Sequence, residues 1–322
     1  MANVCVLGAA GGIGQSLSLL LARDLPFGST LSLYDVAGVP GVAADLSHID
    51  NPAITVKSAM GTAGVRRDPA LAAMAVGVDV FVILAGVPRK PGMSREDLFP
   101  LNAAIVSDVV QTCARASPRA VFCLVTNPVN RLVPIAARAL RAIGLYDRNR
   151  VLGVTALDVL RATRFINEAR WPLLVQTVPV VGGHSRDSIV PLFHQLQGPL
   201  PDDPALAAIA RHVQVGGDDV VRAKNDRGTA TLSMAEAGAR FTMSVVRGLK
   251  GAEKPLVCAY VDTAGQHAME FFAIPMILGQ NGIERRLPIG PIAPSEKKLL
   301  DKAIAIVKDD IEIANQFALS KL

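Results

Sequence analysis

The chain has 322 residues, half of them hydrophobic and 19% charged, a composition typical of a compact globular protein with room for two domains. Its net charge of +5 comes from scattered basic residues. With 4% aromatic residues and no nucleic-acid motif, the sequence does not indicate binding to nucleic acid. No apolar run approaches the roughly 18 residues of a membrane-spanning helix. We expect the first residues to form a strand and not a signal peptide, because no basic segment precedes their apolar run.

The chain contains four cysteines, Cys5, Cys113, Cys123 and Cys258, and none of them forms a C-x-x-C pair. Three lie in apolar, strand-like stretches. We therefore expect small buried thiols in a reducing compartment, and neither disulfides nor a metal site.

Strand and helix patterns alternate through the first half of the chain. Short apolar runs lie at residues 4–7, 31–34, 78–84 and 120–124, and helical patterns lie between them, for example at 103–115 and 132–142. Near-continuous apolar strands separated by helices are typical of a parallel sheet that helices cover on both faces. We predict an α/β fold in which residues 1–150 form a doubly wound parallel Rossmann sheet that binds a dinucleotide.

The pattern changes after about residue 151. Strand-like runs lie at 173–181, 188–192, 256–261 and 271–278, with a turn at Asn281-Gly282, and helical patterns lie at 204–223, 234–249 and 295–317. The strands near the end read as an antiparallel pair. We predict that residues 151–322 form an α+β domain that packs on the first and carries the substrate site.

A glycine-rich loop at residues 8–14 follows the first strand and opens the first helix. Glycine lets backbone N–H groups approach a phosphate closely, and the helix N-terminus adds a favourable field. Asp35 ends the second strand, where a carboxylate binds the adenosine ribose and repels a 2′-phosphate. The alternatives are a plain turn for the glycine loop and a simple cap for Asp35. The strand, the loop with its helix, and Asp35 together predict a cofactor site that prefers NAD to NADP. The candidate cofactor-binding residues of the loop are Gly8, Gly11, Gly12, Ile13 and Gly14.

Two arginines, Arg89 and Arg95, lie in a loop rich in glycine and proline after the strand at 78–84. Ligands of such sheets bind at the carboxyl ends of the strands, and two cations on a mobile loop suit a lid that closes over an anion. A solvated basic loop is an equally good reading of the spacing alone.

A histidine and a carboxylate form a second candidate group. His184 follows a strongly apolar strand and two glycines, a setting that the other four histidines lack. Asp158 and Arg161 lie three residues apart and share a helix face, although an ordinary surface ion pair has the same spacing. A buried carboxylate such as Asp158 would orient the His184 ring and favour its protonated form, so that the ring can donate and accept a proton.

Motifs of several other enzyme classes are absent from the sequence. It has no G-x-S-x-G elbow, no G-K-[ST] phosphate loop and no H-E-x-x-H metal motif. No tyrosine is followed four residues later by lysine, which excludes the catalytic pair of short-chain reductases.

Over essentially its whole length the chain resembles the malate dehydrogenases of the mitochondrial and bacterial dimeric type. The segments that carry the resemblance are V-L-G-A-A-G-G-I-G-Q, L-Y-D-V, D-L-S-H-I, A-G-V-P-R-K-P-G-M-S-R-E-D-L, T-N-P-V-N, L-D-V-L-R, G-G-H-S and A-T-L-S-M-A. The resemblance implies the lactate/malate dehydrogenase fold, reversible NAD-dependent hydride transfer between malate and oxaloacetate, and a homodimer formed by helices that flank the cofactor domain.

The resemblance also implies a role for each catalytic and substrate-binding residue. His184 would be the acid/base, and Asp158 would hold its imidazole. Arg161 would grip the carboxylate next to the reacting carbon, Arg95 would polarise the carbonyl of oxaloacetate, and Arg89 would bind the distal carboxylate.

The remaining implied contacts lie around the nicotinamide. Asn127 would hydrogen-bond the substrate, while Asn102, the backbone at Val125 and Met234 would line the nicotinamide side. The lactate-specific relatives carry a neutral glutamine in place of Arg89. The alternative function is a 2-hydroxy-acid dehydrogenase of broader specificity, acting on lactate or aromatic keto acids.

The sequence departs from the family pattern at two places. Arg186 stands where a glycine usually follows Gly-Gly-His-Ser, and we expect an added cation that either acts on His184 or points to solvent. Residues 225–228 replace a loop richer in glycine beside the active site. Both departures bear on rates and substrate tolerance more than on the type of reaction.

The sequence ends in Ser320-Lys321-Leu322, a tripeptide that the peroxisomal import receptor reads. A frayed helix end is the alternative. We expect the protein to reside in a peroxisome or a specialised relative such as a glycosome.

Overall fold

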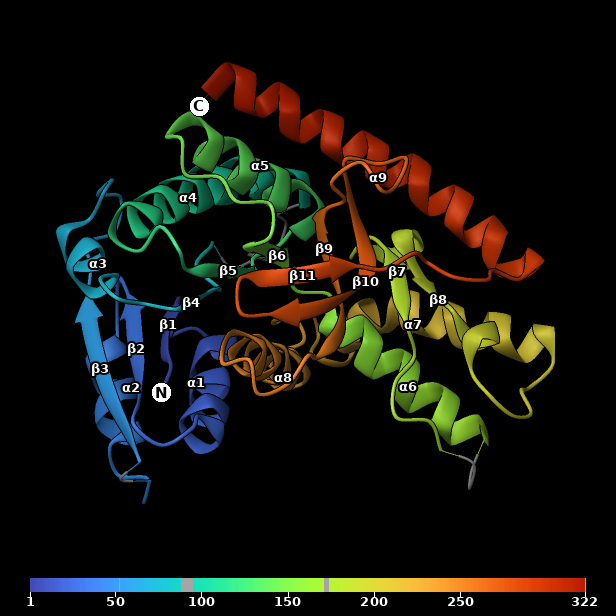
Figure 1. Cartoon of the computed structure of the whole chain (residues 1–322), viewed down its shortest axis with the longest axis horizontal. Helices are drawn as coiled ribbons and strands as arrows, with labels where there is room; N and C mark the ends of the chain where they lie inside the picture. The colour runs from blue at the N-terminus through green and yellow to red at the C-terminus, as the bar shows by residue number, and fades with distance from the viewer. Residues whose placement is uncertain (52, 88–94, 171–173, 322) are drawn as a thin grey trace.

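The computed structural model describes residues 1–51, 53–87, 95–170 and 174–321. Within these residues the strands form one mixed sheet that runs through the molecule in the order β3-β2-β1-β4-β5-β6-β9-β10-β7-β8, with β11 beside β10. Figure 1 shows helices on both sides of this sheet. None of the described helices combines the length and apolar character that crossing a bilayer requires.

The first half forms the parallel part of the sheet, and the prediction of a doubly wound Rossmann sheet is confirmed. Its strands are β1 (Asn3–Leu7), β2 (Ser29–Asp35), β3 (Ile54–Met60), β4 (Val80–Ile83), β5 (Val121–Leu124) and β6 (Val151–Gly153). β4 and β5 are buried along their whole length, as expected for strands covered on both faces. β3 lies at the edge of the sheet, where its residues alternate between partly buried and exposed, so no continuous apolar run marks it.

The second half adds antiparallel strands to the same sheet. These are β7 (Val180–Gly182), β8 (Ile189–Pro191), β9 (Leu256–Asp262), β10 (Phe271–Gly279) and β11 (Gly282–Arg286). β9 and β10 pair along seven registered positions, which confirms the predicted antiparallel pair. β9 also pairs with β6, so the two halves share one sheet.

The predicted strand at 173–181 is wrong for most of its described part, because only Val180 and Val181 of that stretch belong to a strand. The Asn167 side chain forms two hydrogen bonds with the backbone of Val175, at 2.8 and 2.9 Å. A side chain therefore satisfies the backbone groups that a neighbouring strand would otherwise pair. Residue 173 lies outside the described residues.

Nine α-helices of the described residues connect and cover the strands. They are α1 (Gly12–Asp24), α2 (Val39–Leu46), α3 (Pro69–Met74), α4 (Arg95–Ala116), α5 (Val129–Ala142), α6 (Ala156–Arg170), α7 (Asp203–Ala223), α8 (Leu232–Leu249) and α9 (Pro294–Lys321). Two short 3₁₀ turns, η1 (Arg186–Ser188) and η2 (Phe193–Gln195), flank β8. α9 packs along α5 and against η1, so the last helix bridges the two halves (Figure 1).

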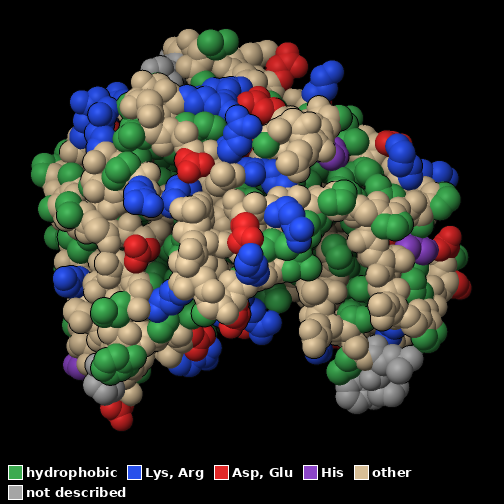
Figure 2. Space-filling model, in the orientation of Figure 1, with side chains coloured by type: hydrophobic (Ala, Val, Ile, Leu, Met, Phe, Trp, Pro, Cys, Tyr) green, Lys and Arg blue, Asp and Glu red, His purple; other side chains and the backbone are tan. Residues whose placement is uncertain are grey.

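The buried thiols and the scattered charges agree with the sequence. All four cysteines are unpaired: Cys5, Cys113 and Cys123 are buried, and Cys258 is partly buried, where loss of solvent around the sulfur raises the pKa of its thiol to about 11. Figure 2 shows basic side chains interspersed with acidic and apolar ones over the displayed face.

Candidate active site

The glycine loop between β1 and α1 packs tightly against the end of β4. Gly8 has a φ of +91°, and a Cβ there would lie 2.8 Å from the backbone nitrogen of Ala85. A Cβ on Gly14 would lie 2.2 Å from the Gly8 carbonyl oxygen. Gly11 caps α1 without a side chain, so the first N–H groups of the helix at Gly12 and Ile13 are left without a side-chain cap. This cradle suits a phosphate group.

Asp35 lies beside the same loop, at the end of β2. Its Oδ2 accepts a hydrogen bond from the Ala10 N–H at 2.9 Å, and its Oδ1 accepts one from the Val36 N–H at 2.7 Å. A carboxylate has further lone pairs for ribose hydroxyls, and its negative charge opposes a phosphate in that place. The loop and the carboxylate together fit a dinucleotide without a 2′-phosphate.

Asn102 connects the two loops that leave the carboxyl ends of β4 and β5. Its Oδ1 accepts a hydrogen bond from the Val87 N–H, and its Nδ2 donates to the Asn127 carbonyl, both at 2.8 Å. Both ends of the buried amide are thus used inside the protein. The Val125 N–H donates to the Ile83 carbonyl and extends the pairing of the two strands. The Asn127 side chain is exposed and has no hydrogen-bond partner among the described residues.

Met234 lies buried in the first turn of α8. The residue before this helix, Thr231, lies so close to the glycine loop that a Cβ on Gly12 would be 3.4 Å from its side chain. The start of α8 therefore forms a wall next to the cradle.

His184 and Asp158 form a buried hydrogen-bonded pair. The Nδ1 of His184 lies 2.6 Å from the Oδ2 of Asp158, and the Asp158 side chain is 0% exposed. An ionised carboxylate only accepts hydrogen bonds, so Nδ1 carries the proton and Nε2 is left for a ligand. The second oxygen of Asp158, Oδ1, is buried and has no partner in the described residues. The imidazole is therefore the chief hydrogen-bond partner of this carboxylate, which fixes the orientation of the ring.

Arg161 lies one helical turn beyond Asp158 but forms no ion pair with it, so the reading as a simple surface pair is wrong. The guanidinium packs against the backbone of α7, where a Cβ on Gly216 would lie 3.1 Å from its Nε. Burial lowers the pKa of Arg161, and the carboxylates of Asp158, Asp219 and Asp218 oppose that effect. A guanidinium keeps its charge in proteins. Arg161 therefore places a cation close to Asp158 that can receive an anion.

The arginine loop is described only at its end. Arg89 lies outside the described residues, and Arg95 is the first residue of α4. The start of α4 lies seven residues before Asn102, and so the helix that carries Arg95 also carries the amide that holds the β4 and β5 loops.

Arg186 is exposed and paired with a carboxylate of α7. Its Nε lies 3.0 Å from the Oδ2 of Asp218 on α7, so it forms an ion pair there. Its φ of +38° lies in the left-handed region that glycine favours, as do the φ angles of Asn225 (+52°) and Asp226 (+59°) in the second departing loop. The backbone thus keeps the shape of a glycine loop although the side chains have changed.

The sequence patterns did not single out Asn130 as a site residue. Its Oδ1 accepts the backbone N–H of His184 at 2.8 Å. Asn130 is the last residue of the T-N-P-V-N segment that carries the family resemblance. Its place in that segment is the one sequence feature that could have indicated a role at the site.

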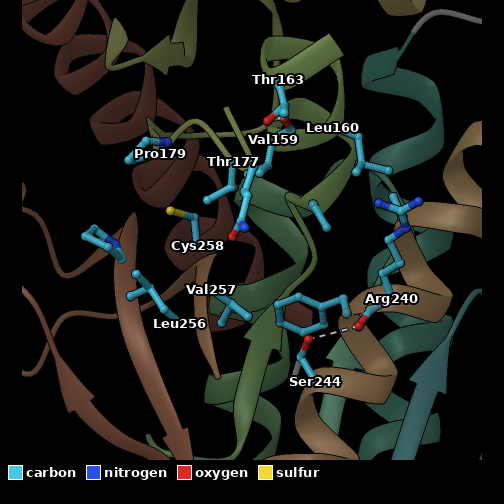
Figure 3. Close-up of a pocket in the computed structure, with 15 residues that line it drawn as sticks. Val159, Leu160, Thr163, Thr177, Pro179, Arg240, Ser244, Leu256, Val257 and Cys258 are labelled. Carbon is cyan, nitrogen blue, oxygen red and sulfur yellow. Dashed lines mark hydrogen bonds between the residues drawn. The ribbon is translucent and has the colours of Figure 1, made fainter. Parts of the chain in front are cut away.

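A second hollow lies on the other side of α6. It is lined by residues of α6, α8, β9 and β10 and by the segment before β7, and neither Asp158 nor His184 is among its lining residues. Figure 3 shows Val159, Leu160 and Val257 around it, with the Ser244 hydroxyl donating to the Arg240 carbonyl at 3.0 Å. No sequence pattern indicated this hollow.

Comparison with known proteins identifies the family. A family model described as lactate/malate dehydrogenase, NAD binding domain, matches residues 2–153. A second model, lactate/malate dehydrogenase, alpha/beta C-terminal domain, matches residues 155–318.

Two curated relatives match over nearly the whole chain. A malate dehydrogenase from Shewanella sediminis is 50% identical over 318 residues, which cover 98% of this chain and 99% of the relative. One from Shewanella halifaxensis is 49% identical over 317 residues, with the same coverage.

Solved structures agree on the fold. The apo malate dehydrogenase of Picrophilus torridus matches with a TM-score of 0.83 at 23% identity, covering 100% of this chain and 99% of that one. A malate dehydrogenase of Cryptosporidium parvum matches with a TM-score of 0.81 at 26% identity, covering 98% and 99%. The two family models together cover almost every residue, and the glycine cradle with its aspartate and the buried histidine–aspartate pair agree with them. This chain therefore belongs to the lactate/malate dehydrogenase family and carries its NAD-binding domain.

Proposed function

We propose that this chain is an NAD-dependent malate dehydrogenase that interconverts malate and oxaloacetate. The observation that carries the proposal is the buried His184–Asp158 pair, with the cationic Arg161 one turn further along α6. The two Shewanella relatives of about the same length, both malate dehydrogenases, support the substrate. We further propose that residues 1–150 hold the cofactor and that residues 151–322 supply the substrate site.

In malate oxidation the hydride of the substrate goes to the cofactor and the hydroxyl proton goes to His184. NAD, when bound in the glycine cradle, supplies the carbon that accepts the hydride from C2 of malate. The Nε2 of His184 takes the hydroxyl proton, and the C2–O bond becomes the carbonyl of oxaloacetate. The imidazolium formed in this step is stabilised by the ionised Asp158, whose hydrogen bond at 2.6 Å also fixes the ring. In the reverse direction the same nitrogen returns the proton.

The arginines hold the substrate in place for this transfer. Arg161 binds the C1 carboxylate, since its partly buried guanidinium can form two parallel hydrogen bonds with it. Arg95 polarises the carbonyl oxygen, and the exposed amide of Asn127 binds the substrate. Asn102, Val125 and Met234 shape the nicotinamide side.

Arg89 is the proposed determinant of substrate choice. A second carboxylate in a closed site needs a fixed cation, because an unpaired buried charge costs several kcal/mol. A 2-hydroxy-acid dehydrogenase of broader specificity is the alternative, and it does not require this cation.

The buried pair is tested by changing Asp158→Asn. The amide keeps the shape of the carboxylate but cannot stabilise the imidazolium, so we expect kcat for NADH oxidation with oxaloacetate to fall by about 10²- to 10⁴-fold. NADH affinity should remain, because Asp158 does not belong to the cradle. The control is Asp301→Asn on the exposed side of α9. Turnover of the Asp158→Asn variant at the rate of the control would exclude the proposed chemistry.

The choice of substrate is tested by changing Arg89→Gln. Loss of the cation should depress kcat/KM for oxaloacetate by about 10²-fold or more, while the value for pyruvate is relatively spared. Lys90→Gln removes the neighbouring positive charge and serves as the matched control. An unchanged preference of oxaloacetate over pyruvate in Arg89→Gln would favour the alternative of broad specificity.

We also infer that the protein is a homodimer whose second copy covers the hollow between α6 and α8. Figure 2 shows the surface hollowed between the regions of these two helices. Apolar residues such as Val159, Leu160 and Phe241 line it, and Leu256 at its rim is 62% exposed. Apolar surface of this kind is covered in stable assemblies. Sedimentation equilibrium should give twice the chain mass of 33.9 kDa, and a monomer at micromolar concentration would contradict the dimer.

The import signal stays a prediction, and the bacterial relatives give it no support. Ser320 lies in the last turn of α9, where its hydroxyl donates to the Phe317 carbonyl at 3.0 Å. We expect a fluorescent fusion that ends in Ser320-Lys321-Leu322 to enter peroxisomes of a eukaryotic cell through the import receptor. The same fusion without the tripeptide should stay in the cytosol, and an identical distribution of the two would refute the signal.

A further inference from the structure

The backbone at His184 is held by a side chain from the first turn of α5. The Oδ1 of Asn130 accepts the His184 N–H at 2.8 Å, while the His184 ring bonds to Asp158 of α6. The histidine is thus fixed at two points, the backbone by α5 and the ring by α6. Asn130 itself is 2% exposed.

The other end of the Asn130 amide is held by the last helix of the chain. Its Nδ2 donates to the Oδ2 of Asp310 on α9 at 2.9 Å. The second oxygen of Asp310 accepts from the Nε of Arg131 at 2.6 Å, and the Arg131 guanidinium lies over the ring of Phe99, 5.6 Å from its centroid. The Asp310 carboxylate, 8% exposed, therefore has a partner on each oxygen and meets the requirement for a buried charge.

The neighbouring backbone leaves room for this contact. A Cβ on Gly183 would lie 2.6 Å from the Asn130 Nδ2 and 2.6 Å from the Ser188 hydroxyl oxygen. Glycine at this position lets the amide reach the backbone of the next residue. Ser188 also accepts the Ser185 N–H at 3.0 Å, which closes the turn after His184.

We propose that Asn130, oriented by Asp310, is a positioning residue that places His184 for proton transfer. The proposal rests on the proposed function, since it concerns the same histidine. The two ends of the amide are matched to their partners, because its oxygen accepts the backbone N–H and its nitrogen donates to a carboxylate. An aspartate offers two acceptors, and a leucine offers neither group. No other side chain of that size satisfies both contacts.

The arrangement links the far end of the chain to the reacting atoms. Asp310 lies on α9, 180 residues from Asn130 in the sequence, and reaches His184 through a single amide. A misplacement of about 1 Å costs on the order of 100-fold in such a transfer. Loss of this contact therefore lowers kcat more than it lowers cofactor affinity.

The test is an exchange of the two polar groups. Asn130→Asp keeps the shape but sets a second carboxylate against Asp310, so we expect kcat with oxaloacetate to fall by about 10- to 100-fold, with NADH affinity unchanged. Adding Asp310→Asn restores complementarity: the new carboxylate at position 130 accepts from the His184 N–H and from the new amide at position 310, whose oxygen accepts from Arg131. The double variant should recover kcat to within about threefold of the wild type.

The matched control is Asn315→Asp, the same substitution at the same contact of α5 and α9. Asn315 accepts from the Nε of Arg138 at 3.0 Å and does not contact His184, so its change should leave kcat unaltered. A role in stability alone predicts wild-type kcat per NADH-binding site in Asn130→Asp. It also predicts no recovery in the double variant. Either result would overturn the proposal.

A second readout does not depend on turnover. Hydrogen exchange of the His184 amide should speed up in Asn130→Asp and slow again in the double variant. If the wild-type chain fails to turn over oxaloacetate, the proposed function fails while this exchange pattern still decides the role of Asn130. If Asn130→Asp does not fold, the double variant decides, because it should fold and react, and an unfolded or inactive product would contradict the proposal.

Discussion

The short hydrogen bond between His184 and Asp158 is the interaction on which the proposed site depends. Bringing the two residues together requires α6, which follows β6 in the parallel part of the sheet, to meet the loop after β7 in the antiparallel part. The pairing of β6 with β9 makes this possible, because it joins both halves into one sheet. The proposed catalytic pair thus lies where the halves meet, next to the carboxyl ends of the strands that carry the candidate cofactor loops.

Burial gives the pair its chemical character. An ionised carboxylate with no exposed surface is costly unless it is paired, and Asp158 has one partnered oxygen and one without a partner among the described residues. The hydrogen bond from the imidazole Nδ1 to Asp158 Oδ2 offsets part of that cost and fixes the orientation of the ring. Arg161 adds a fixed cation nearby that a substrate carboxylate can neutralise. The proposed reaction therefore uses two positive groups, the His184 imidazolium and Arg161, and one buried negative group, Asp158. Asp158 and Arg161 lie within two turns of α6, and His184 lies in the loop after β7.

Local patterns predicted the parts of the fold in which neighbours in the sequence are also neighbours in space. The strand, glycine loop and helix at residues 3–24 and the aspartate at the end of β2 follow from apolar runs and from glycine spacing. The same holds for His184, whose glycine pair sets it apart from the other histidines. β3 escaped prediction because an edge strand is only half buried, and the stretch before β7 was misread because the Asn167 side chain takes the place of a strand partner.

Contacts between distant segments could not be predicted. Asp310 contacts Asn130 across 180 residues, and no periodicity within α9 distinguishes it from the other acids of that helix. Arg186 was expected to act on the histidine or to face solvent, and its side chain is 61% exposed; its ion pair with Asp218 was not predicted, because it depends on the position of α7. The roles of Arg89 and Arg95 come from the family resemblance, and they are proposals.

The protonation of the His184 ring tests the central claim most directly. Nitrogen-15 NMR of the histidine-labelled chain, compared with the Asp158→Asn variant, reports which ring nitrogen carries the proton. We predict that Nδ1 carries the proton of the neutral ring in the wild-type protein, because it donates to Asp158 Oδ2, and that Nε2 is unprotonated there. A neutral ring protonated only at Nε2 in the wild-type protein would contradict this claim, because Nδ1 would then have no proton to give to the carboxylate.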